Sequence, residues 1–194
     1  MPVNRPAGDM NKKIIAATPF GSVAIIWAVM DGAPKILRVL LSKPGLPSEH
    51  RVSGLYPQVQ ASSCPKIDDV AAGISRMLEG EAVDFPLSVA NLSMCGGFQQ
   101  HVLRAEHAIP RGHVSTYRLI ARYLGKANGA RAVGNALAKN PFPLIVPCHR
   151  AIRSDRSLGG YQGGLDMKRA LLEAEGIRFD GAGKVQCLRF HYEI

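Results

Sequence analysis

The sequence lacks the paired cysteines and long apolar runs that mark disulfide-stabilised or membrane-spanning proteins. Its four cysteines, Cys64, Cys95, Cys148 and Cys187, lie far apart and none belongs to a CxxC pair. This spacing argues against a disulfide framework and a zinc ribbon, so we expect reduced thiols in a cytosolic compartment. No run approaches the length of about 20 apolar residues that spans a bilayer, and no internal repeat or low-complexity tract is present.

One stretch near the N-terminus imitates a targeting signal. Lys12 and Lys13 precede the apolar run IIAATPFGSVAIIWAVM, and a basic stub before an apolar run resembles a secretory signal. However, Pro19 and Gly21 interrupt the run, and TPFGS has the composition of a turn. Two strands joined by a hairpin therefore explain the stretch better than a signal peptide does.

The first half of the chain combines strands with one helix. Branched apolar residues predict strands at residues 13–18, 21–29 and 35–42. Residues 45–58 have the composition of a loop, and residues 68–80 form a helical pattern with acidic residues in its first turn. A proline-containing linker follows, so we place a domain boundary near Ser93.

The second half reads mainly as helices. Amphipathic patterns and their stop signals predict helices at 98–109, at 115–125 with Ser115 as the N-cap, at 129–140 and at 164–176. Residues 179–190 resemble a hairpin. The expected fold class is α+β: residues 1–93 form a mixed structural domain with a small β-sheet and a helix, and residues 94–194 form a mostly helical, winged-helix-like domain.

The positive charge is concentrated in the helical half. Residues 1–95 carry nine Lys/Arg and eight Asp/Glu, a net charge of +1, whereas residues 96–194 carry fifteen and seven, a net charge of +8. The two helices expected within residues 115–140 have helix-turn-helix spacing, although two packed core helices would show the same pattern. The charge asymmetry favours DNA binding.

The candidate recognition helix has few side chains that could read bases. ARAVGNALA consists largely of small residues, with Arg131 as its one charged residue. Small residues allow a helix backbone to approach a narrow minor groove closely. We therefore expect binding through phosphates and DNA shape with little sequence preference, and a place for the Arg131 side chain within the base stack.

The most reactive side chain follows a buried-looking segment. In LIVPCHRAIR, four apolar residues end at Pro147, and Cys148, His149 and Arg150 follow without a spacer. We expect residues 144–146 to form a strand that holds the thiol in place. A neighbouring base can activate a thiol, but adjacent side chains can point apart. The pattern thus leaves open a nucleophile or an inert, packed cysteine; Cys64, Cys95 and Cys187 fit the second interpretation.

The residues around Cys148 resemble a known family. NPFPLIVPCHRAIRSDRSLGGYQGGLDMKRALLEAEG is similar to the active-site region of the O6-alkylguanine-DNA alkyltransferases, in which PCHR contains the acceptor cysteine. GHVSTYRLIARYLG and ARAVGNALAKNP are similar to the helix-turn-helix of that family. The resemblance covers roughly residues 96–177. It implies flipping of a damaged guanine out of the duplex and irreversible, single-turnover transfer of its O6-alkyl group, or of an O4-alkyl group of thymine, to Cys148.

The resemblance also implies a role for each matching position. His149 would take the thiol proton through a water, Glu175 would orient His149, and Asn140 would hold the turn that carries Cys148. Tyr117 would press on the target phosphate and help to protonate the leaving base, and Arg131 would fill the gap in the stack. Tyr161, Gln162 and the backbone at Val146 and Cys148 would line the pocket for the base. The DNA backbone would be bound by Gln99, Arg118, Lys126 and Ser154.

Three other functions stay possible from the sequence. They are a lesion-binding protein without transfer activity, which the presence of Cys148 disfavours, a transcriptional regulator and a cysteine hydrolase. No cofactor is expected. Some relatives bind structural zinc in the N-terminal domain, but His50, Cys64 and Cys95 lack ligand spacing here, so we expect no metal. We expect a monomer that binds double-stranded DNA in the cytoplasm, or in the nucleus of a eukaryotic source, and no membrane association.

Overall fold

The computed structural model describes residues 9–187 and 189–193, and these residues form two compact units. The first unit comprises residues up to 94 together with residues 141–145, and the second comprises residues 95–140 and those from 146 onward. We expected residues 1–93 and 94–194 to form the two domains, with residues 141–145 in the second. Residues 141–145 belong to the first unit instead. Each unit is described by itself below.

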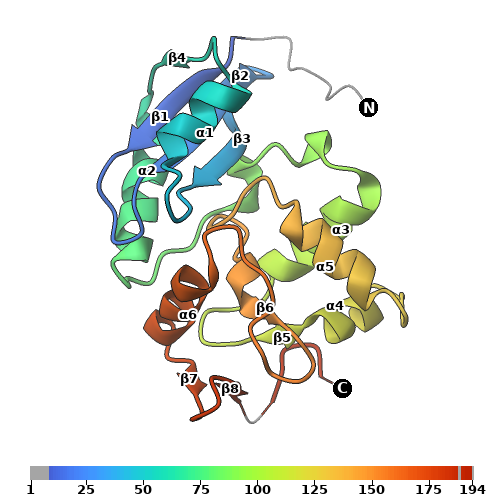
Figure 1. Ribbon diagram of the computed structural model, residues 1–194. Coiled ribbons are helices and arrows are strands. Elements are labelled where there is room, and N and C mark those ends of the chain that lie inside the picture. Colours follow the sequence, from blue (N-terminus) through green and yellow to red (C-terminus); the bar gives the residue numbers. More distant parts are fainter. Residues whose placement is uncertain (1–8, 188, 194) are drawn as a thin grey trace. The chain divides into compact units, whose positions relative to one another are not determined.

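The first unit contains a four-stranded sheet (Figure 1). Its strands, in the spatial order β3-β2-β1-β4, are β1 (Asn11–Ile15), β2 (Val23–Met30), β3 (Ala33–Leu41) and β4 (Gln60–Ala61). The three predicted strands are confirmed. Because β1 pairs with β2 in antiparallel register and the backbone N–H of Gly21 donates to the carbonyl of Thr18 at 3.1 Å, the hairpin interpretation of residues 12–30 is also confirmed.

Two helices belong to the first unit, and one of them was not expected. Helix α1 (Ser48–Leu55) forms where a loop was predicted, so that prediction was wrong. The serine hydroxyls of Ser22 and Ser42 accept hydrogen bonds from the N–H of Ser48, at 3.2 and 3.0 Å. These side chains, which are distant in sequence, provide a hydrogen-bond partner for an N–H in the first turn of α1. The residues of this helix themselves have low helix propensity.

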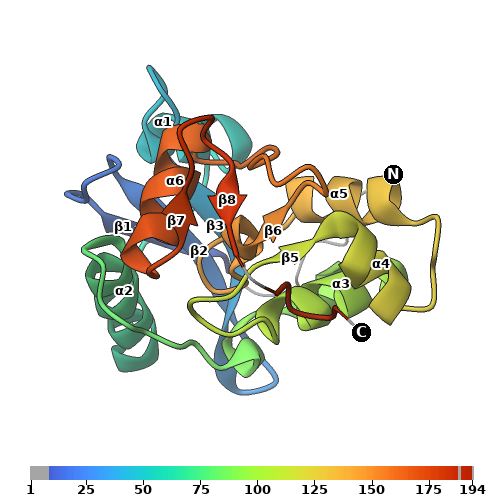
Figure 2. The same ribbon diagram turned by 90° about the horizontal axis from the view of Figure 1, so that it is seen from below.

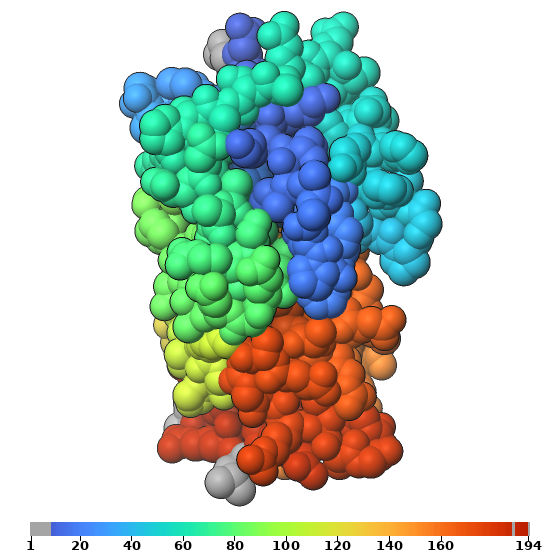
Figure 3. Space-filling view, turned by 90° about the vertical axis from the view of Figure 1, so that its left-hand side faces the viewer, coloured from blue at the N-terminus to red at the C-terminus, as the bar shows by residue number. Residues whose placement is uncertain are grey.

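Helix α2 (Pro65–Leu78) begins three residues before the predicted start. Pro65 stands in the first turn, where a missing N–H costs nothing. Its buried side chains recur at helical spacing, with Ile67, Val70, Ile74 and Met77 facing the core. In the space-filling view, α2 in green lies beside the dark blue β1 segment, which it contacts (Figure 3).

The second unit is mostly helical, as predicted. Its helices are α3 (Gly97–His107), α4 (Tyr117–Tyr123), α5 (Ala130–Ala138) and α6 (Leu165–Ala174). Short 3-10 helices also occur among the described residues: η1 (Leu87–Val89) and η2 (Leu92–Met94) in the first unit, and η3 (Cys148–Arg150) in the second. Together with the small sheet of the first unit, these elements confirm the α+β class.

Two small sheets complete the second unit. Strands β5 (Ser115–Thr116) and β6 (Ala151–Ile152) pair in parallel. Strands β7 (Arg178–Phe179) and β8 (Val185–Gln186) form the predicted antiparallel hairpin, which lies next to α6 (Figure 2). Residue 188, within the predicted hairpin range, lies outside the described residues.

The N-cap of α4 differs from the prediction. Thr116, not Ser115, caps the helix, because its hydroxyl accepts the N–H of Leu119 at 3.1 Å. Ser115 belongs to β5 instead, and its hydroxyl donates to the carbonyl of His191 at 2.7 Å. This one-residue change leaves Tyr117 as the first residue of α4.

Helices α4 and α5 pack against each other across a tight turn. Gly125 in this turn has a φ of 70°, in the left-handed region that favours glycine. A Cβ at Gly129 would lie 2.9 Å from both the Cβ and the carbonyl oxygen of Lys126. The turn therefore requires glycine at both positions, as the helix-turn-helix interpretation predicts. Within residues 9–187 and 189–193, no helix is long and apolar enough to cross a membrane.

Candidate active site

Cys148 begins the 3-10 helix η3 and is 5% exposed. The predicted strand at 144–146 is not present: these residues are buried but form a turn, and Leu144 has a φ of 74°. The side-chain amide of Asn140 donates to the carbonyl of Val146 at 3.2 Å, and the N–H of Cys148 donates to the same carbonyl at 2.7 Å. A turn held by Asn140, not a strand, therefore carries the cysteine.

The Cys148 thiol has little tendency to ionise by itself. Burial raises its pKa to about 11, although a hydrogen bond from the Asn140 side chain acts in the opposite direction. Because the thiolate is the nucleophilic form, a thiol with this pKa needs a nearby base.

His149 has the properties of that base. Its side chain is fully buried, and its Nε2 lies 2.9 Å from Oε1 of Glu175. Burial lowers the pKa of His149 despite the attraction of Glu175, which favours a neutral ring. Since a carboxylate only accepts, the Nε2–H donates to Glu175 and the Nδ1 keeps its lone pair. Nδ1 has no hydrogen-bond partner among the described residues.

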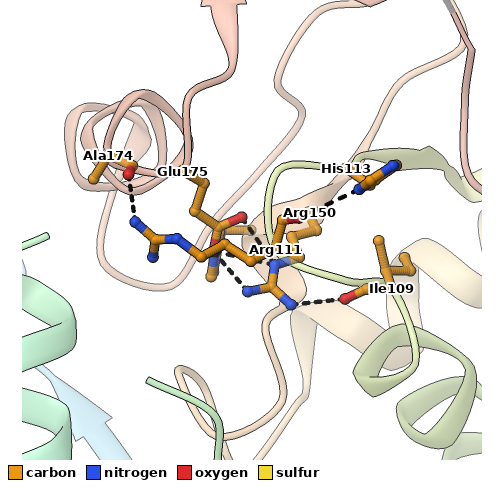
Figure 4. Close-up of polar contacts among 7 residues, drawn as sticks. Ile109, Arg111, His113, Arg150, Ala174 and Glu175 are labelled. Atoms are coloured by element: carbon orange, nitrogen blue, oxygen red, sulfur yellow. Dashed lines mark hydrogen bonds and ion pairs between the residues drawn. The ribbon is translucent and has the colours of Figure 1, made fainter. Parts of the chain in front are cut away.

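Arg150 binds the same carboxylate as His149. Its Nε lies 2.9 Å from Oε2 of Glu175 and its Nη2 lies 2.7 Å from Oε1, while Nη1 donates to the carbonyl of Ile109 at 2.7 Å. Figure 4 shows the guanidinium between Glu175 and that carbonyl. Burial acts to raise the pKa of Glu175, but hydrogen bonds from His149 and Arg150 outweigh it and lower the pKa to about 2.

The sequence could not show that Arg150 joins the site. Side chains that are adjacent in sequence often point apart, but the 3-10 turn brings both His149 and Arg150 onto Glu175. The site therefore contains a buried Arg-Glu-His chain whose end is a lone pair on His149. Such a chain fixes the tautomer of the imidazole and can accept a proton.

Three predicted pocket residues lie in the second unit with different partners. Tyr161 meets the His149 ring edge-on at 6.3 Å between centroids, and its buried hydroxyl has no partner among the described residues. The amide of Gln162 donates to the carbonyl of Asn140 at 2.6 Å. Tyr117 is half-buried, and burial, together with Glu106 and Cys148, raises its pKa to about 12, so its hydroxyl keeps its proton.

Most of the predicted DNA-contacting side chains are exposed. Arg131 lies in the first turn of α5, Arg118 on α4, Lys126 in the turn between these helices, and Ser154 after β6. Gln99 is half-buried, and its amide donates to the carbonyls of Ala136 and Lys139 at 3.0 and 3.1 Å, next to the end of α5. Its amide hydrogens are thus already engaged within the protein.

Two fully buried ionisable residues were missed by sequence reasoning. Glu106 on α3 has no hydrogen-bond partner for either carboxylate oxygen among the described residues, and Lys168 on α6 donates only to backbone carbonyls. The N–H of Ala151 acts to lower the pKa of Glu106 without meeting ordinary hydrogen-bond geometry. Position 106 lies on the buried face of α3 together with Val102 and Leu103, but a glutamate carries no apolar signal from which its burial could be predicted.

The other cysteines lie apart from this chemistry. Among the described residues no cysteine forms a disulfide; Cys95 is buried, and Cys64 and Cys187 are half-buried. Over the part of the chain that the structure describes, His, Cys, Asp and Glu side chains do not gather into any group of three that could hold a metal ion.

Comparisons with known proteins converge on one family. Residues 97–177 match the family described as 6-O-methylguanine DNA methyltransferase, DNA binding domain. The methylated-DNA–protein-cysteine methyltransferase of Methanothermobacter thermautotrophicus is 46% identical over 108 residues, which cover 56% of this chain and 60% of the relative. The protein of the same name from Mycobacterium leprae is 45% identical over 128 residues, which cover 64% of this chain and 76% of the relative.

Solved structures show the same similarity over a longer part of the chain. The O6-methylguanine methyltransferase of Mycobacterium tuberculosis has a TM-score of 0.65 at 28% identity and covers 86% of this chain and 92% of its own. Mycobacterium tuberculosis OGT in complex with DNA has the same TM-score and identity, with coverages of 85% and 92%. The match to the Methanothermobacter relative spans less than two thirds of that protein.

Proposed function

The chain belongs to the methylated-DNA–protein-cysteine methyltransferase family, and we propose that it repairs O6-alkylguanine in DNA by transferring the alkyl group to Cys148. The observation that carries this proposal is the buried thiol next in sequence to a neutral imidazole. Its Nδ1 has no hydrogen-bond partner within the described part of the chain, and its Nε2 is held by Glu175. Glu175 is in turn fixed by Arg150. A repair activity of this type needs no cofactor.

The transfer proceeds by displacement at the alkyl carbon. The Cys148 proton passes through a bridging water to Nδ1 of His149, and Glu175 stabilises the imidazolium. The sulfur forms a bond to the alkyl carbon while the bond between that carbon and O6 breaks. The guanine leaves with the electron pair and takes a proton from the hydroxyl of Tyr117, which later regains one from solvent. Because ordinary reductants do not reverse a thioether, each molecule acts once.

The second unit binds the DNA. Its net positive charge supplies attraction for phosphates, and the small residues of α5 allow close approach to the minor groove. Arg131 enters the base stack in place of the flipped nucleotide. Contacts to the DNA backbone involve Arg118, Lys126, Ser154 and the segment at Gln99, whose side-chain amide is itself bound to the end of α5. The protein binds DNA as a monomer and with little sequence preference.

The flipped base occupies a pocket beside Cys148. Tyr161 and Gln162 line it, Tyr117 presses on the phosphate of the target nucleotide, and backbone groups at Val146 and Cys148 read the base edge. Since an O4-alkyl group of thymine is attached to a comparable exocyclic oxygen, the same pocket accepts it as a second substrate.

Mass spectrometry tests the proposed function. The protein is mixed with excess duplex DNA that contains O6-methylguanine, and its mass is measured over time. We expect a gain of one methyl group, which maps to the peptide with Cys148, and we expect Cys148→Ser to remain unmodified while still binding DNA. Methylation of Cys64, Cys95 or Cys187 instead, or continued turnover without protein modification, would overturn the proposal.

A further inference from the structure

Lys168 is a motif residue of GYQGGLDMK without an assigned role, and it is fully buried. Its Nζ donates to three backbone carbonyls: those of Ala151 and Leu158 at 2.6 Å each, and that of Gly160 at 3.5 Å. Ala151 belongs to β6, whereas Leu158 and Gly160 lie in the loop that leads from β6 to the pocket residues. The ammonium on α6 thus binds the loop at two points and β6 at a third.

The stability of the fold does not explain a buried lysine at this position. Burial lowers the pKa of Lys168 to about 8, so the folded state holds an ammonium that water would solvate better. Buried charged groups can often be replaced by apolar side chains of similar volume without loss of stability. The three carbonyl contacts therefore indicate that Lys168 maintains the geometry of the loop.

Gly159 lies between two residues that Lys168 binds, and it supports the side chain of Tyr117. Its φ is 69°. A Cβ at this position would lie 2.6 Å from the hydroxyl oxygen of Tyr117 and 3.2 Å from the Cε2 of its ring. The hydroxyl of Tyr117 therefore packs directly on the backbone of Gly159, so the position of the loop backbone determines where that hydroxyl lies.

We propose that Lys168 is a positioning residue for alkyl transfer, which holds the loop at residues 158–160 so that Gly159 places the Tyr117 hydroxyl for proton donation to the leaving base. This inference rests on the proposed function, because it assigns Lys168 to the step in which Tyr117 acts. Lys168 acts on Tyr117 through the loop, so removing Lys168 displaces the hydroxyl.

A double-mutant cycle tests the proposal. Single-turnover rates of methyl transfer from saturating O6-methylguanine duplex are measured for the wild type, Lys168→Met, Tyr117→Phe and the double variant. Loss of a proton donor slows such a step by roughly 10² or more, and we expect a loss of this size in each single variant. In the Tyr117→Phe background no hydroxyl remains that the loss of Lys168 could displace. The transfer rate of the double variant should therefore be within about threefold of the rate of Tyr117→Phe, since coupled sites are non-additive.

Two outcomes separate the failure of this inference from the failure of the proposed function. If the wild type transfers methyl to Cys148 but the losses of the single variants multiply in the double variant, Lys168 only supports the fold and the inference is overturned. If the wild type transfers no methyl group to Cys148, the proposed function itself fails.

A second pair of variants covers the case in which Lys168→Met does not fold. Gly159→Ala should displace Tyr117 without touching Lys168, and its effect on the rate should largely disappear in the Tyr117→Phe background. Gly183→Ala is the matched control for backbone strain: Gly183 has a φ of 72°, and a Cβ there would meet only Nη1 of Arg169, at 3.9 Å. Equal slowing by Gly159→Ala with and without the Tyr117 hydroxyl would overturn the inference.

Discussion

Glu106 allows a sharp prediction about stability. This carboxyl is fully buried on α3 and lacks hydrogen-bond partners among the described residues. Burial raises its pKa from 4.5 to about 8, against the opposing influence of Lys168 and Arg150. In the variant Glu106→Gln the side chain keeps nearly the same shape but cannot ionise. Comparing this variant with the wild type therefore isolates the effect of ionisation on the free energy of unfolding.

The magnitude follows from the two pKa values. Below pH 4.5 the carboxyl is protonated in both the folded and the unfolded chain. Between pH 4.5 and 8 the unfolded chain releases the proton while the folded chain keeps it, so stability falls as pH rises, by about 1.4 kcal/mol per pH unit. Across the whole interval the wild type loses about 5 kcal/mol that Glu106→Gln does not lose.

Urea unfolding followed by far-ultraviolet circular dichroism measures this difference. Between about pH 5.5 and 7.5, the free energy of unfolding of Glu106→Gln should rise relative to the wild type by about 3 kcal/mol. Glu173→Gln, which removes an exposed carboxylate on α6, controls for the loss of one negative charge. A difference between Glu106→Gln and wild type that stays constant with pH would mean that Glu106 is ionised in the fold, and the argument from burial would be wrong.

Three further variants test the site and its supports. Glu175→Gln should slow single-turnover transfer by roughly 10² to 10⁴, since His149 loses the partner that stabilises its imidazolium; an unchanged rate removes Glu175 from the mechanism. Arg131→Ala should slow repair strongly in duplex DNA but weakly on an unpaired target or free O6-benzylguanine, and equal slowing on all three rejects the extrusion role. Tyr192→Phe should lower the free energy of unfolding by about 1 kcal/mol in urea titrations, because its hydroxyl donates to the carbonyl of Ala105 at 2.8 Å; no change would show that this bond contributes nothing.

The elements that the sequence predicted are those with local signals. Strands β1 to β3 and helices α3 to α6 show dense branched apolar residues or amphipathic repeats with recognisable stop signals. Helix α1 was missed because its stabilising hydroxyls come from Ser22 and Ser42, which propensity over residues 45–58 does not include. The turn at residues 144–146 was mistaken for a strand because buried apolar residues look alike in both.

The site was predictable only as far as motifs identify residue types. PCHR identified Cys148 and His149, and spacing identified Glu175, but the direction of Arg150 depends on the 3-10 turn that η3 forms. The roles assigned to Asn140, Tyr117 and the DNA-contacting residues stay predictions. No pattern identified Lys168 as a loop-holding residue, since its three acceptors are backbone carbonyls, which have no sequence signature.

The buried charges of the second unit connect its stability to its chemistry. Arg150 and Glu175 neutralise each other in a direct ion pair, whereas Lys168 binds backbone carbonyls and forms no ion pair within residues 9–187 and 189–193. While Glu106 keeps its proton, Lys168 therefore contributes an uncompensated positive charge close enough to lower the pKa of Cys148 against the effect of burial. An ionised Glu106 would raise that pKa further. Burial of Glu106 thus lowers the stability of the fold near neutral pH, but it also keeps Glu106 neutral, so that no negative charge opposes ionisation of the thiol. Such shifted ionisable groups are expected where they serve a reaction.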